Sequence, residues 1–269
     1  HLVIRRQRQM CIRDRIAASF WLAASAQALE AKLNKDDLPV LAPEVQHETA
    51  SKRVTSRFTR SHYKHFNLND DFSKAIFERY VEMLDYNRNI FTQADIDSFK
   101  DWSISLDDQL KAGNNKIAFD VYNLSMQKRF DRFAYALTLL DKEIKFDTDE
   151  FIELDRSEAA WPKDEAELNE LWRKRVKYDA LNLKMTGKEW PEIKEVLEKR
   201  YNNAMKRITQ TRNEDAFQLY MNAFAREVDP HTSYLSPRNA EQFQSEMNLS
   251  LEGIGAVSYT HLRAHETVV

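Results

Sequence analysis

Apolar residues recur at every third or fourth position through most of the chain after Glu44, which is the spacing of amphipathic helices. The pattern predicts a first helix ending near Leu84, with Asn69 and Asp70 as candidate N-caps. A second predicted helix begins at Thr92 and ends at Gly113, and a long third helix spans 119–140. The residues expected to face inward are Phe72, Ile76, Phe77, Tyr80, Val81 and Leu84; Ile96, Phe99, Leu106 and Leu110; and Phe119, Tyr122, Met126, Phe130, Phe133, Leu137 and Leu140.

Residues 141–163 interrupt this pattern. The segment is acidic and without a clear period, and we interpret it as a surface connection with Trp161 tucked against the helices. Helical spacing resumes over 165–185, ended by Gly187, then from Pro191, which suits a first helical turn, and again over 214–228. The inward positions predicted here are Leu168, Leu171, Trp172, Val176 and Leu181; Ile193, Leu197, Tyr201, Met205 and Ile208; and Phe217, Tyr220, Met221, Phe224 and Val228.

Composition supports a mainly α protein. The 269 residues are 42% hydrophobic and 31% charged, and they include only 4 Gly and 6 Pro, too few for the many turns of an all-β fold. The formal net charge is -3, and arginines near the N-terminus conceal a more acidic middle of the chain. Such a charge balance disfavours a nucleic-acid-binding surface.

Residues 16–28 have the pattern of a cleavable signal peptide. Arg13 and Arg15 precede a short apolar run, and Ala26-Gln27-Ala28 provides the small residues of a cleavage site. The run is too short to span a bilayer, and a buried N-terminal helix is the alternative interpretation. The sequence therefore predicts export, and the single cysteine, Cys11, would be removed with the signal.

Residues 1–15 and 257–269 resemble translated adaptor sequence, and we interpret both as non-native tails. The alternative is that they are native and unusual. We exclude both stretches from predictions about the fold.

Two groups of polar residues invite a catalytic or metal-binding interpretation. Asp229, His231, Ser233 and Ser236 could suggest a hydrolytic triad, but residues this close in one turn diverge, whereas a triad must converge. We expect a rigid turn instead, with Asp229 accepting backbone N–H groups and Ser236 capping a helix that begins at Pro237. His62 and His65 lie three apart, as on one helix face, but no further residues have metal-ligand spacing.

A dense basic run occupies 52–64. On a helix, Arg53, Arg57, Arg60 and Lys64 would form one cationic stripe. Two interpretations remain open: a solvated face opposite the acidic residues 141–155, or a surface that binds a partner.

The segment from Asp229 to Pro237 reads D-P-H-T-S-Y-L-S-P, and Gly253-Ile254-Gly255-Ala256 follows it. This combination resembles the tail-specific proteases, which are C-terminal processing peptidases of family S41. Residues 54–63 and 161–169 are similar to the periplasmic members of that family in Gram-negative bacteria. The resemblance implies a helical N-terminal domain over 29–235, followed by a connecting helix and the truncated start of a PDZ domain over 236–256.

The resemblance also implies a function. Members cleave proteins recognised by apolar C-terminal tails, using a serine activated by a lysine, and no Ser or Lys of this chain matches that catalytic motif. Gly253, Ile254, Gly255 and Ala256 would begin the PDZ loop whose backbone N–H groups bind the tail carboxylate, with Leu249 and Leu251 near its pocket.

The resemblance implies protein substrates, a lipoprotein adaptor with helical repeats as a partner, no cofactor, no nucleic acid and only indirect membrane association. The chain taken alone is expected to be inactive. A free-standing helical adaptor or docking module, without enzymatic activity, is the alternative. A metal-binding helical protein is a third hypothesis.

Overall fold

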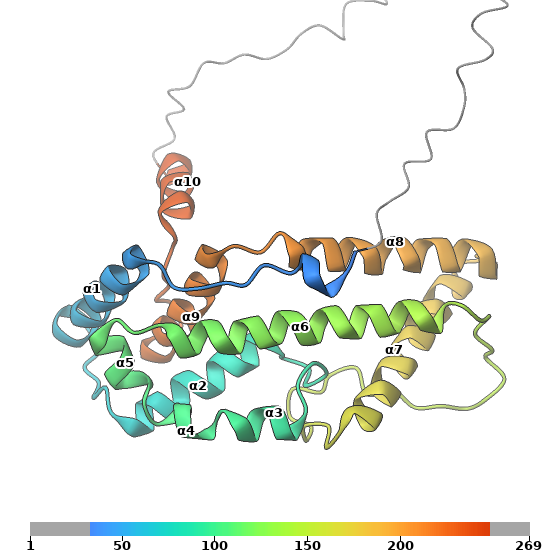
Figure 1. Ribbon diagram of the computed structural model, residues 1–269, viewed down its shortest axis with the longest axis horizontal. Helices are drawn as coiled ribbons and strands as arrows, with labels where there is room; N and C mark the ends of the chain where they lie inside the picture. The colour runs from blue at the N-terminus through green and yellow to red at the C-terminus, as the bar shows by residue number, and fades with distance from the viewer. Residues whose placement is uncertain (1–32, 248–269) are drawn as a thin grey trace, which may run out of the picture. The chain divides into compact units, whose positions relative to one another are not determined.

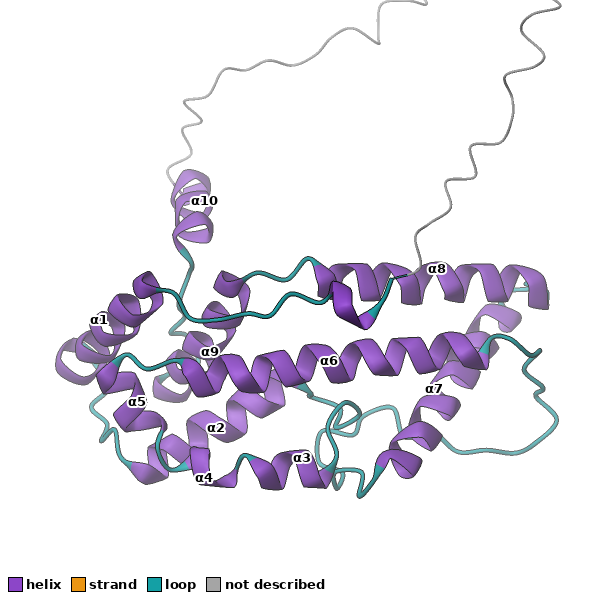
Figure 2. Ribbon diagram, viewed as in Figure 1, coloured by secondary structure: helices purple, strands orange, loops and turns teal. Residues whose placement is uncertain are grey.

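The computed structural model describes residues 33–247, and every regular element within this range is helical (Figures 1 and 2). The elements are η1 (Lys35–Asp37), α1 (Val45–Ser61), α2 (Asp70–Leu84), α3 (Gln93–Ser98), α4 (Lys100–Ser103), α5 (Leu106–Ala112), α6 (Lys116–Leu139), α7 (Glu165–Met185), α8 (Trp190–Thr209), α9 (Asn213–Val228) and α10 (Pro237–Met247). The predicted mainly α fold is thus confirmed for this part of the chain. The residues of the predicted PDZ start that follow Met247 lie outside the described range.

Helix α6 runs through two apolar clusters. Its first half packs with α2, α5 and α9 around Phe119, Val121 and Met126, while its second half packs with α7 and α8 around Ala136 and Leu140. The helix has 24 residues and is therefore about 36 Å long at 1.5 Å per residue. Because α6 contributes to both clusters, its apolar residues surround most of the helix axis instead of forming one narrow stripe.

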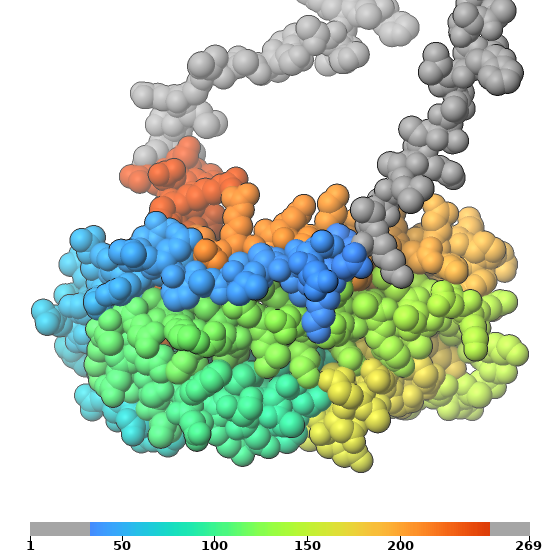
Figure 3. Space-filling model, in the orientation of Figure 1, coloured from blue at the N-terminus to red at the C-terminus, as the bar shows by residue number. Residues whose placement is uncertain are grey.

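The segment that precedes α1 lies along α6 (Figure 3). The side chain of Asn123 on α6 accepts a hydrogen bond from the Leu41 N–H at 3.0 Å and donates one to the Leu41 carbonyl at 2.8 Å. Farther along α6, Lys35 pairs with Asp131 at 2.6 Å. Two side chains of α6 thus hold an irregular segment whose backbone groups have no neighbouring strand to bond.

Several predicted helix boundaries are confirmed. Asn69 caps α2 by accepting from the Phe72 N–H, Thr92 caps α3, and α7 ends just before Gly187. The side chain of Ser236 accepts from the Asn239 N–H at 3.4 Å, at the start of α10. In each of these cases a short local motif decides the boundary.

The predicted single helix from Thr92 to Gly113 is wrong, because three short helices, α3, α4 and α5, occupy this stretch. Phe99, Trp102 and Ser105 each donate a backbone hydrogen bond to the residue three positions earlier. Such tight turns redirect the chain between the helices. Phe99 and Leu106, on either side of α4, both lie in the first apolar cluster.

In α7 the buried residues recur every fourth position, at Leu168, Trp172, Val176 and Ala180. The predicted inward position Leu181 is therefore wrong, since its side chain is 37% exposed while Ala180 is fully buried. The interpretation of 141–163 as a connection is confirmed. Trp161 at its end packs on the first apolar cluster beneath the Arg88 guanidinium, 5.3 Å from the ring centre.

No helix between residues 33 and 247 combines the length and the apolar character needed to cross a bilayer.

Gly113 and Gly187 provide a matched pair for testing the contact between α1 and α5. Both have positive φ, but a Cβ at Gly113 would lie 2.7 Å from the Glu48 carbonyl oxygen, whereas a Cβ at Gly187 would have open space. We expect Gly187→Ala to cost about 1 kcal/mol, from backbone strain alone, and Gly113→Ala about 2–4 kcal/mol, since α1 must also shift. Urea unfolding measures both values, and equal losses would contradict the close approach of α1 and α5.

Candidate functional site

The predicted tail-binding loop, Gly253, Ile254, Gly255 and Ala256, lies outside the described residues, as do Leu249 and Leu251. The segment that leads toward it is described. We call residues 229–236, between α9 and α10, the exit turn. Its geometry decides where α10 begins.

Asp229 closes the first part of the exit turn. Its carboxylate accepts a hydrogen bond from the His231 N–H at 2.9 Å, which confirms the predicted Asx-type turn. It also accepts one from the Tyr63 hydroxyl at 2.5 Å. The Tyr63 hydrogen bond, followed by that of the His231 N–H, lowers the pKa of Asp229 below its ordinary value of 3.8. A residue just after α1 thereby fixes the end of α9.

His62 provides a second contact from the same place. Its Nε2 lies 3.0 Å from the Thr232 hydroxyl, and its Nδ1 accepts from the Lys64 N–H at 3.1 Å. The expectation that His62 and His65 share a helix face is wrong, because α1 ends at Ser61. No group of His, Cys, Asp or Glu within residues 33–247 could hold a metal ion.

Helix α9 holds the exit turn from the other side. The Asn222 side chain accepts from the Tyr234 N–H at 2.9 Å and donates to the Tyr234 carbonyl at 3.0 Å. Gln218, one turn earlier, accepts from the Ser236 N–H at 3.0 Å and from the Asn239 amide at 2.8 Å. The turn is therefore held by side chains of α9 along its length, up to the first turn of α10.

The exit turn does not form a catalytic triad. His231 is 95% exposed, and its Nδ1 lies 3.6 Å from the Asp229 carboxylate. The hydroxyl of Ser236 caps α10. A serine nucleophile requires a base within hydrogen-bonding reach, so these residues are structural, as the sequence indicated.

A buried group that the sequence did not reveal lies behind the turn. His47 is almost fully buried; its Nδ1 accepts a hydrogen bond from the Glu44 N–H at 3.0 Å, and its Nε2 lies 3.1 Å from the Glu214 carboxylate. Phe217 stacks on His47 and meets Tyr234 edge-on. Burial, and then the Glu214 charge, raise the pKa of Tyr234 to about 12. The separation of 167 residues between His47 and Glu214 hid this group from any local pattern.

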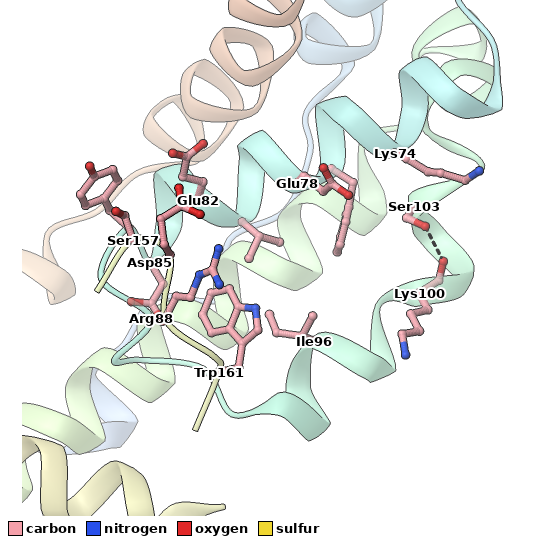
Figure 4. A pocket seen from close by; sticks show the side chains of 14 residues that line it. Lys74, Glu78, Glu82, Asp85, Arg88, Ile96, Lys100, Ser103, Ser157 and Trp161 are labelled. Carbon is pink, nitrogen blue, oxygen red and sulfur yellow. Dashed lines mark hydrogen bonds between the residues drawn. The ribbon is translucent and has the colours of Figure 1, made fainter. Parts of the chain in front are cut away.

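A separate cavity of about 570 Å³ lies between α2, α3, α4 and residues 157–161. Figure 4 shows the Trp161 ring between Arg88 and Ile96, with Glu82 on α2 and Asp85 directly after the end of α2. Burial raises the pKa of Asp85, opposed by hydrogen bonds from three backbone N–H groups. Asp85 thus serves the loop after α2 rather than a ligand.

The hydroxyls that line this cavity are not activated. Ser103 donates to the Lys100 carbonyl, and Ser157 donates to the Asp155 carboxylate. Neither serine hydroxyl bonds to a lysine side chain, as a serine nucleophile activated by a lysine would require. Among the described residues, the exit turn is thus held from two sides, and both serines of the cavity bond to neighbouring residues.

The Tyr63 hydrogen bond gives a test of the exit turn. Because the folded state lowers the pKa of Asp229, the ionised carboxylate stabilises the fold above the ordinary value of 3.8, and this contribution is lost as the pH falls through the folded pKa. We expect Tyr63→Phe to lower the unfolding midpoint near neutral pH and to have a smaller effect below pH 3.8. Thermal melts across this range measure it, with Tyr86→Phe as the control; a loss independent of pH would contradict the assignment.

Comparison with known proteins places these features in a family. The model of the tail-specific protease N-terminal domain matches residues 54–238. A shorter match, to the B melanoma antigen family, covers residues 10–42. The tail-specific protease of Haemophilus influenzae is 50% identical over 234 residues, which are 87% of this chain and 34% of that protein. The chain thus spans about a third of the length of this curated relative. By the extent of these matches, the chain belongs to the tail-specific protease family and carries its N-terminal domain.

Proposed function

We propose that residues 33–247 are the helical platform of a periplasmic serine endopeptidase that degrades or processes proteins with apolar C-terminal tails. The observation that carries this proposal is the match of the N-terminal domain model over residues 54–238, which ends at the second residue of α10. The alternative of a free-standing adaptor gains no support from these matches.

The exit turn suggests how the platform acts. The exit turn forms hydrogen bonds on two sides, with His62 and Tyr63 after α1 and with Gln218 and Asn222 on α9. Its last residue, Ser236, caps α10. A connection held in this way fixes the orientation of the domain that follows it relative to the helices, whereas a flexible connection would allow many orientations. We propose that the turn sets the position of a PDZ domain beginning with Gly253, Ile254, Gly255 and Ala256, which would bind the substrate tail.

Cleavage itself is assigned to a serine and a lysine of a catalytic domain that residues 33–247 do not include. A lysine acts as a base when burial lowers its pKa. Within this proposal the platform contributes placement, and a lipoprotein adaptor with helical repeats is a proposed partner.

A chimera tests the platform role. The matching part of the Haemophilus influenzae relative is replaced by residues 33–247, and cleavage of a substrate with an apolar C-terminal tail is compared with that of the same substrate ending in two aspartates. We expect the chimera to cleave the apolar substrate selectively and the 269-residue chain to cleave neither, because the proposal assigns the serine–lysine pair to the catalytic domain that the chimera takes from the relative. Turnover by the chain alone that a serine-directed inhibitor abolishes would contradict the proposal.

The control for this experiment is a chimera with Gln218→Ala and Asn222→Ala. We expect it to retain its helical content but to have a lower kcat/KM, since the exit turn loses its bonds to α9. Equal activity of both chimeras would show that the turn does not position the catalytic domain.

Export is tested separately. Residues 1–35 are fused to alkaline phosphatase lacking its own signal, and enzyme activity and the N-terminus of the product are measured in a Gram-negative host. We expect activity and cleavage after Ala28. Replacing Trp21 and Leu22 with aspartate should abolish both, because it interrupts the apolar run. An uncleaved, inactive fusion would contradict the signal peptide.

A further inference from the structure

The outer side of α1 carries three arginines that the fold leaves without ion partners. Arg53, Arg57 and Arg60 are exposed, while the opposite side of the helix buries Ser51 and Thr55. No carboxylate among residues 33–247 lies within ion-pair distance of these three, although Lys52 beside them pairs with Glu48 at 2.5 Å. Lys64, predicted to extend the stripe, follows the end of the helix. We call Arg53, Arg57 and Arg60 the arginine stripe.

The acidic segment that could have neutralised the arginine stripe is used elsewhere. Glu150 accepts hydrogen bonds from Arg173 at 2.6 Å and from Lys177 at 2.9 Å, both on α7. These hydrogen bonds lower the pKa of Glu150 to about 2. The hypothesis that residues 141–155 face the basic run is therefore wrong.

The surface around the arginine stripe is open. Ser56 and Ser61 are small and lie beside the arginines on the same helix. Helix α1 packs on α5 and α9, and Arg53, Arg57 and Arg60 remain exposed. Between residues 52 and 61 no large apolar side chain is exposed. A bilayer surface would favour apolar side chains beside the basic ones, so the stripe is better suited to a protruding polar partner.

We propose that the arginine stripe binds an acidic α-helix of a partner protein, through carboxylates spaced at four and three residues. Arg53, Arg57 and Arg60 follow the same i, i+4, i+7 spacing, so two helices lying side by side can pair each guanidinium with one carboxylate. Arginine suits this role because its planar group forms two parallel hydrogen bonds to a carboxylate. This inference does not rest on the proposed protease function.

The arginine stripe ends close to the exit turn, so a helix bound to the stripe would lie near that turn. Its last arginine, Arg60, is two residues before His62, which contacts Thr232 of the exit turn, and three residues before Tyr63, which bonds to Asp229. A helix bound to the stripe would lie beside the point where the chain continues into α10. Binding there would place the partner next to whatever follows the exit turn.

The probe is a fluorescein-labelled 21-residue helical peptide with glutamates at i, i+4 and i+7 on one face, measured by anisotropy against the 269-residue chain. We expect binding to weaken at least about tenfold in the triple variant Arg53→Glu, Arg57→Glu, Arg60→Glu. Each exposed ion pair contributes little to the affinity, but the variant removes three of them together. Raising the salt from about 0.1 M to about 1 M should also weaken binding, since the Debye length falls from about 10 Å to about 3 Å.

Two controls match the charge change. Lys199→Glu, Lys206→Glu, Arg207→Glu reverses three exposed cations of α8 and should leave the affinity within about twofold. A scrambled peptide with its glutamates spread around the helix should bind more weakly than the patterned one. Both charge-reversed variants should have the same melting temperature as the parent chain. A milder variant at the stripe, Arg53→Gln, Arg57→Gln, Arg60→Gln, removes the charges without reversing them and should also bind the peptide more weakly.

Three outcomes would overturn the proposal. They are equal binding by the stripe variant and the parent, equal binding of the patterned and scrambled peptides, or no peptide binding together with stripe-dependent sedimentation on vesicles of anionic phospholipid. The last outcome would assign the stripe to a membrane surface instead of a protein helix.

Discussion

The arrangement depends on α6 being buried against two apolar clusters at once. Phe133 on α6 packs against both clusters. Its ring meets that of Trp172 edge-on, with 5.3 Å between the ring centres. Arg132 beside it is buried and pairs with Glu165 and Asn169 at the start of α7. Helix α6 is thus held both by apolar packing and by a buried ion pair. Because its residues belong to both clusters, a shift of α6 would disturb the packing of both.

The exit turn draws its rigidity from this arrangement. Helix α9 packs on α2 and α6, and its residues Phe217, Tyr220 and Phe224 are fully buried, so the side chains of Gln218 and Asn222 start from a fixed backbone. Tyr63, which follows the end of α1, bonds to the turn from the other side. A polar turn can be held this firmly because its backbone groups bond to side chains on elements that the core already fixes.

Charge is distributed unevenly over the described surface. Arg173 and Lys177 of α7 pair with Glu150 of the 141–155 connection, and Lys128 is paired with both Asp95 and Glu165. The outer side of α1 is different, because its arginines face solvent without such partners. Exposed ion pairs contribute little to stability, so the absence of partners there costs the fold little and leaves those groups available for recognition.

The sequence by itself determined the helical class, several helix boundaries and the family. Helical spacing follows from local periodicity, and caps such as Asn69, Thr92 and Ser236 act within three residues, so both can be read along the chain. The D-P-H-T-S-Y-L-S-P segment indicated the family before any fold was known, and Asp229 performs the local role expected of it.

Only the tertiary structure decided which distant residues meet. Residues 93–112 form three short helices that contribute Phe99, Leu106 and Leu110 to one core, and Glu150 pairs with Arg173 of α7 across 23 residues. Tyr63 meets Asp229 across 166 residues, and His47 meets Glu214 across 167. Such contacts depend on the packing of the whole core, and no pattern within a few residues encodes them.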